Sequence, residues 1–137
     1  MSEILHSTDA VMAIHKPGGL LVHLSTRATH ETQDAWTLLQ AQLGERLHTV
    51  HRLDKGTSGV LLFARHAEAA RALGAAFEAG LIRKRYMALV RGWPAAEGLI
   101  DASLARDPEL PSAGQPRLDA QTRFRVLQQH EWPFGDG

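Results

Sequence analysis

The sequence predicts an α+β fold, in which a mixed, mostly antiparallel sheet carries two flanking helices. Short apolar runs typical of strands occur at residues 11–14 and 60–63, and residues 121–127 alternate in polarity as a half-buried strand does. Residues 32–43 and 66–79 instead place apolar side chains at helical spacing, and each of these two segments runs into a glycine that can end a helix.

The other segments are predicted from the same local patterns. Residues 4–5 form a short first strand, and the polar residues 24–32 form a loop. Residues 86–91 alternate in polarity and predict a further strand. Residues 93–119 contain four prolines, which predicts an irregular connector with one strand near residues 99–100.

Composition limits the classes of protein that the chain can belong to. Its 137 residues suffice for one domain with a core, and 44% apolar with 22% charged residues is an ordinary globular balance. The chain has no cysteine, which excludes a disulfide framework and thiolate zinc sites. No apolar run approaches the roughly 18 residues of a membrane helix, and no signal-peptide pattern opens the chain, so we expect a cytoplasmic protein.

Charge is unevenly distributed, although Lys and Arg together balance Asp and Glu over the whole chain. Residues 46–91 carry nine Lys or Arg and only three acidic residues, so this segment is strongly basic. A basic segment can guide a polyanion to a site, or it can simply be a solvated face. Charge alone leaves both interpretations open.

The stretch from His51 to Leu62 is the strongest candidate for chemistry. Asp54 stands between Arg52 and Lys55, in small turn residues that lead into an apolar strand. A carboxylate on a loop beside a rigid strand can act as nucleophile or general base, and cationic neighbours favour its ionised form. The alternative is an Asp that only caps a turn.

Two rival enzyme classes have weaker support. A hydrolase could use Ser58 with His51 and Asp54, but residues so close in sequence seldom form a triad, and no G-x-S-x-G motif is present. A zinc enzyme could use some of the eight histidines, but no HExxH motif or i, i+4 pair on a helix occurs.

Four ordered blocks, within residues 3–127, resemble those of the RluA-type pseudouridine synthases. They are KPGGLLVH at residues 16–23, HRLD at 51–54 with TSG at 57–59, RKRYMALVRG at 83–92, and AQTRF at 120–124. The chain is most similar to the branch of that family that modifies tRNA. The resemblance implies the pseudouridine synthase fold and an RNA-modifying isomerase that needs neither a metal nor another cofactor.

The resemblance also implies roles for individual residues. Asp54 would be the catalytic nucleophile, and Tyr86 would act beside the flipped base near C5 of the uracil. Arg52, Lys84 and Arg85 would bind the RNA. Without the motifs, Tyr86 would more often be a strand residue that fills the core. Arg52 would more often be a partner of Asp54, and Lys84 and Arg85 could be the solvated end of a strand.

Lys16, in the KPGG block, either lines the rim of the pocket or flanks the Pro17 turn, and the turn is the favoured interpretation.

The expected partner is RNA, with tRNA favoured and large-subunit ribosomal RNA as the alternative; a non-catalytic RNA-binding module would share every basic residue. We expect no membrane partner, and the sequence is silent on oligomeric state. The chain resembles the front part of a catalytic domain, without the small N-terminal RNA-binding domain of some relatives. The family's Arg partner of the nucleophile finds no match in residues 1–137, so we expect these residues to be inactive alone.

Overall fold

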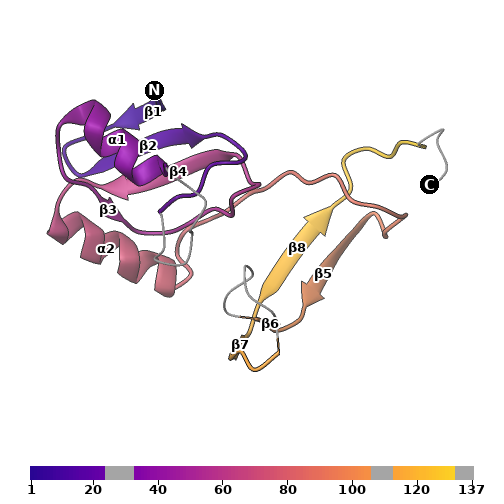
Figure 1. Ribbon diagram of the computed structural model, residues 1–137. Coiled ribbons are helices and arrows are strands. Elements are labelled where there is room, and N and C mark those ends of the chain that lie inside the picture. The colour runs from indigo at the N-terminus through magenta and orange to yellow at the C-terminus, as the bar shows by residue number, and fades with distance from the viewer. Residues whose placement is uncertain (24–32, 106–112, 132–137) are drawn as a thin grey trace. The chain divides into compact units, whose positions relative to one another are not determined.

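The computed structural model describes residues 1–23, 33–105 and 113–131, which separate into two compact units (Figure 1). The units are Met1–Arg85 and Tyr86–Gly137. The loop expected at residues 24–32 lies outside the described residues. None of the helices in the described parts of the chain has both the length and the apolar character needed to cross a membrane.

The first unit is built on a four-stranded antiparallel sheet in the order β1-β2-β4-β3. Its strands are β1 (Glu3–Ser7), β2 (Val11–Lys16), β3 (His48–Thr49) and β4 (Gly59–Ala64). The structure confirms the strands expected at residues 4–5, 11–14 and 60–63. The two-residue strand β3 was not predicted, because so short a segment has no periodicity to recognise.

The core lies on one face of the two central strands. Met12 pairs with Phe63 and Ile14 pairs with Leu61, so these four side chains share a face of the sheet. Helix α1 (Ala35–Leu43) adds Leu39 to the same buried cluster. Burial of these apolar side chains stabilises the first unit.

Local capping sets the ends of α1. The side chain of Asp34 accepts a hydrogen bond of 2.6 Å from the Thr37 amide, and Asp34 itself has extended backbone angles. At the other end Gly44 is left-handed, with φ of 71°, and its amide donates to the Gln40 carbonyl. The helix therefore starts three residues later than residue 32, because Asp34 serves as the N-cap.

The second helix agrees closely with its prediction at residues 66–79. Helix α2 runs from Ala67 to Glu78, with His66 as its N-cap and Ala79 as its C-cap. The Nδ1 atom of His66 accepts a hydrogen bond of 3.2 Å from the Ala69 amide. The helix packs against β3 and β4, the two strands that the 50–58 loop connects.

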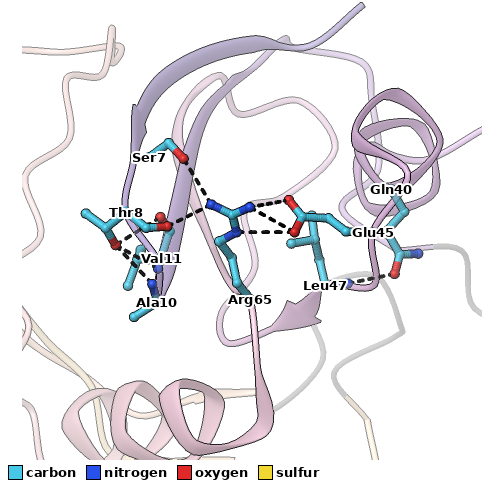
Figure 2. A network of polar contacts seen from close by, with 8 residues as sticks. All are labelled: Ser7, Thr8, Ala10, Val11, Gln40, Glu45, Leu47 and Arg65. Atoms are coloured by element: carbon cyan, nitrogen blue, oxygen red, sulfur yellow. Dashed lines mark hydrogen bonds and ion pairs between the residues drawn. The ribbon is translucent and has the colours of Figure 1, made fainter.

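Arg65, directly after β4, joins three parts of the first unit (Figure 2). Its guanidinium donates to both carboxylate oxygens of Glu45, at 2.9 Å from Nη2, and its Nη1 donates to the Thr8 carbonyl at 2.9 Å. A planar guanidinium can bind both oxygens of one carboxylate through parallel hydrogen bonds, a fixed geometry that a lysine ammonium does not offer. The contact fixes the β1–β2 turn and the segment after α1 against the end of β4.

The second unit contains two short antiparallel pairs. They are β5 (Glu97–Asp101) with β8 (Gln121–Arg125), and β6 (Leu104–Ala105) with β7 (Arg117–Leu118). Phe124 lies opposite Gly98, where an added Cβ would stand 2.7 Å from the Phe124 ring, so any larger residue would force the ring to move. The strand expected at 99–100 is confirmed, and the strand expected at 121–127 is confirmed as far as Arg125. Strands β6 and β7 were missed in the predicted connector.

The strand predicted at residues 86–91 is wrong for this structure. These residues have no regular secondary structure, and the Tyr86, Met87 and Leu89 side chains are all exposed. Alternation in polarity shows that a segment suits a half-buried strand, but a strand also needs a neighbour that satisfies its backbone groups. Among the described residues no strand pairs with this segment.

Candidate catalytic loop

Asp54 lies in the loop of residues 50–58 that joins β3 to β4. The Thr57 amide donates to the Asp54 carbonyl at 3.0 Å, which closes a tight turn, and the Asp54 side chain is exposed. Leu53, the residue before it, is 7% exposed and belongs to the core cluster. The loop is therefore anchored in the core at one residue and presents a carboxylate to solvent at the next.

A second loop, at residues 17–20, lies against the Asp54 loop. The Gly19 amide donates to the Lys55 carbonyl at 2.7 Å. A Cβ atom added at Gly18 would stand 3.2 Å from the Gly56 carbonyl oxygen, so the two backbones meet closely there. The KPGG block and the HRLD block, which are far apart in the sequence, thus form one layer of packed loops.

Lys16, at the end of β2, contacts both of these loops. Its side chain is fully buried, and its Nζ atom donates to the carbonyls of Pro17 at 2.8 Å, Leu20 at 2.6 Å and Lys55 at 3.2 Å. Three carbonyl oxygens match the three donors of an ammonium group. Lys16 therefore holds the 17–20 loop and the Asp54 loop together.

The charge of Lys16 is also linked to Asp54. Burial lowers the pKa of Lys16, and the negative charge of Asp54 acts in the opposite direction. The interpretation of Lys16 as a residue that only flanks the Pro17 turn is therefore wrong. Sequence reasoning missed a usable signal, since Lys16 follows Met12 and Ile14 at a spacing of two and so points to the same buried side of β2.

His51, at the start of the HRLD block, is bound to β4 rather than to a nucleophile. Its Nε2 atom accepts a hydrogen bond of 2.9 Å from the Leu62 amide. In a hydrolase triad this histidine would have to take a proton from Ser58, but the ring nitrogen that accepts is already occupied by the amide. The geometry therefore argues against the hydrolase alternative.

The three cations assigned to RNA binding are all exposed. Arg52 belongs to the same loop as Asp54, whereas Lys84 and Arg85 lie at the end of the first unit, after α2. Lys84 comes near enough to His51 for its charge to act on the histidine ring. The first unit therefore carries Asp54 and all three candidate cations.

Tyr86 is the first residue of the second unit and is 61% exposed. The alternative of a tyrosine that fills the core is wrong for this structure. The pairing of Tyr86 with Asp54 in one site stays a prediction. Across the described residues no group of three or more His, Asp or Glu side chains is placed to hold a metal ion.

Comparisons with known sequences match most of the chain to pseudouridine synthases. The sequence profile described as RNA pseudouridylate synthase matches residues 10–134. A protein of Pasteurella multocida named tRNA pseudouridine synthase C is 45% identical over 102 residues, which are 74% of this chain and 42% of the relative. The protein of the same name from Haemophilus ducreyi is 39% identical over 98% of this chain and 57% of the relative.

A solved structure agrees with the sequence matches. Human RNA Pseudouridylate Synthase Domain Containing 4 superposes with a TM-score of 0.68 at 27% identity, over 93% of this chain and 54% of the human chain. This match confirms the predicted fold. The chain spans about half the length of the curated relatives that it matches.

We predict that Lys16→Met lowers the free energy of unfolding of the first unit by about 2–4 kcal/mol. Methionine has a similar length but no donor, so three part-buried carbonyl oxygens lose their hydrogen bonds. Each unsatisfied group costs about 1–3 kcal/mol before water relieves part of the loss. Urea denaturation followed by circular dichroism measures the change.

Lys55→Met is the matched control, because it removes an exposed ammonium group and keeps the backbone carbonyl that Lys16 binds. Equal stability of the Lys16→Met variant and the wild type would contradict the role given to Lys16.

Proposed function

Because the chain belongs to the RNA pseudouridylate synthase family, we propose that it carries the catalytic loop of an RNA pseudouridine synthase that isomerises a uridine in tRNA. The observation that carries the proposal is the exposed Asp54 carboxylate on a loop fixed by the buried Lys16. The tRNA substrate is supported by the names of the relatives from Pasteurella multocida and Haemophilus ducreyi. Such a substrate also favours a cytoplasmic location.

The reaction is an isomerisation that needs no redox step. The bond between ribose C1′ and uracil N1 breaks, the uracil turns, a bond between C1′ and C5 forms, and the proton of C5 is replaced by one on N1. In this proposal Asp54 is the nucleophile. Its fixed loop lowers the cost of bringing the carboxylate to the sugar.

The target nucleotide has to leave its stack before the carboxylate can reach it, at a cost of a few kcal/mol. Tyr86 supplies an exposed aromatic ring for stacking on the flipped base and a hydroxyl near C5. Arg52, Lys84 and Arg85 contact the RNA, where cations contribute affinity with little dependence on sequence. These roles follow from the family motifs together with the exposure of all four side chains.

The test uses the 137-residue chain and a chimera in which this chain replaces the aligned part of the Haemophilus ducreyi relative. Unmodified tRNA is incubated with each protein, and pseudouridine is mapped by mass spectrometry. The chimera should form pseudouridine at one site in tRNA. Binding of tRNA without pseudouridine by both proteins would contradict the enzyme proposal and favour an RNA-binding module, and modification of ribosomal RNA alone would overturn the substrate.

We predict that Asp54→Asn in the active protein abolishes pseudouridine formation and leaves tRNA affinity within about threefold, because affinity rests on phosphate contacts. Single-turnover rates and filter binding measure the two quantities separately. Asp9→Asn, in the exposed β1–β2 turn, is the matched control and should keep full activity. Near wild-type turnover of the Asp54→Asn variant would exclude Asp54 as the nucleophile.

We predict that Tyr86→Phe lowers the single-turnover rate at least about 100-fold, as is typical for the loss of a general base. The ring remains, so tRNA affinity should change little. Tyr86→Leu should in addition weaken binding, because stacking on the base is lost. If Tyr86→Phe kept the wild-type rate and only Tyr86→Leu were impaired, Tyr86 would serve in stacking alone.

A further inference from the structure

His51 continues the contact between β3 and β4 with its side chain. The backbone ladder between these strands ends at the pair Thr49 and Phe63. At the next position along β4, the Leu62 amide donates to Nε2 of His51 at 2.9 Å. The ring therefore ties the beginning of the Asp54 loop to the central sheet, three residues before the carboxylate.

This hydrogen bond defines the protonation state of the ring. A backbone amide can only donate, so Nε2 must offer its lone pair, and the ring proton of the neutral histidine is on Nδ1. A second proton would convert Nε2 into a donor that faces the Leu62 amide. Protonation of His51 is therefore incompatible with the observed contact.

The surroundings of His51 favour the neutral ring. The ring is half-buried and stacks on Phe77 of α2, with centroids 4.8 Å apart and planes inclined by 18°. Strand β4 has no titratable side chain, and the α2 positions one turn and two turns before Phe77 are the apolar Leu73 and Ala70. The charged group that acts on the ring is Lys84, in the segment after α2.

Burial and, to a smaller extent, the Lys84 ammonium lower the pKa of His51. A histidine with a lowered pKa in the folded state contributes stability that is fully present above the unfolded pKa of about 6.5 and is lost as the pH falls through the folded pKa. The loss of stability that follows protonation of His51 therefore occurs below about pH 6.5.

We propose that His51 is a positioning residue: its neutral ring holds the Asp54 loop in place through the Leu62 amide, and its protonation releases the loop. This inference rests on the proposed function only where activity is concerned. Lys16 holds the Asp54 loop at Lys55, and His51 holds the same loop at its beginning. When His51 becomes protonated, the loop keeps its anchors at Leu53 and Lys55 but loses the one at its beginning. A carboxylate displaced by about 1 Å can lose on the order of 100-fold in rate.

Two substitutions separate the hydrogen bond from the charge. His51→Gln places an amide oxygen near the position of Nε2, so it keeps an acceptor for the Leu62 amide but cannot ionise near neutral pH. His51→Leu keeps an apolar side chain against Phe77 and offers no acceptor. If the leucine variant fails to fold, the glutamine variant still decides the question.

The first measurement needs no activity and uses the 137-residue chain. The amide signals of Leu62, Asp54 and Thr57 are followed by NMR from pH 8 to pH 5, together with the carbon-bound protons of the His51 ring. In the wild type the three amides should shift with the midpoint of the His51 ring, and Lys84→Gln should raise that midpoint. In His51→Gln the same amides should stay constant.

The proposal would be wrong if the amide signals of Asp54 and Thr57 did not shift with the ionisation of the His51 ring. It would also be wrong if these signals shifted with pH equally in the wild type and the His51→Gln variant. A titrating Leu62 amide with an unchanged Asp54 loop would also overturn it, because His51 would then stabilise β4 alone.

The second measurement is the pH profile of the single-turnover rate on tRNA, in whichever of the chain or the chimera forms pseudouridine. His51→Gln should keep the rate at pH 8 within about threefold and lose less activity at pH 5.5 than the wild type. His51→Leu should be at least about tenfold slower than the wild type at pH 8, with a smaller difference at pH 5.5. The proposal would be wrong if the rate of the His51→Gln variant fell at acid pH as steeply as the rate of the wild type. Absence of pseudouridine from all proteins would count against the proposed function, and the NMR titration would still decide the role of His51.

Discussion

A fully buried ammonium group holds the candidate catalytic loop. Lys16 stands at the end of β2 on the side of the sheet that faces the core, and its charge is compensated by three backbone carbonyls rather than by a buried carboxylate. Burial of an isolated charge is costly unless its hydrogen bonds are satisfied. The carbonyls of Pro17, Leu20 and Lys55 must therefore be present together, which requires the two loops to adopt one arrangement.

The rest of the first unit supports that arrangement. Leu53 places the residue before Asp54 in the core, and the His51 ring ties the start of the loop to β4. Asp54 is thus exposed although its neighbours on both sides are fixed. A reactive carboxylate benefits from such a scaffold, because a group held in its productive position loses little entropy in the reaction.

The elements whose apolar residues recur at a regular spacing could be predicted from the sequence. The features that depend on contacts with distant parts of the chain could not. Both helices and the main strands carry their apolar spacing in the sequence, and the HRLD block pointed directly to Asp54. The strand at residues 86–91 failed, because alternation cannot supply a neighbouring strand. The role of Lys16 in holding the two loops was missed for another reason, because a lysine at a core position is rare. Its burial is explained by three carbonyl acceptors, which come from two loops that are far apart in the sequence.

The central claim is that the Lys16 ammonium holds the Asp54 loop in place, and amide hydrogen exchange in a Lys16→Met variant tests it most directly. The Gly19 amide, bound to the Lys55 carbonyl, and the Thr57 amide, bound to the Asp54 carbonyl, report on the loops. The Thr8 amide, bound to the Val11 carbonyl, reports on the β1–β2 turn. The loop amides should exchange at least about tenfold faster in the variant and the Thr8 amide at an unchanged rate; unchanged loop exchange, or an equal acceleration at all three amides, would contradict the claim.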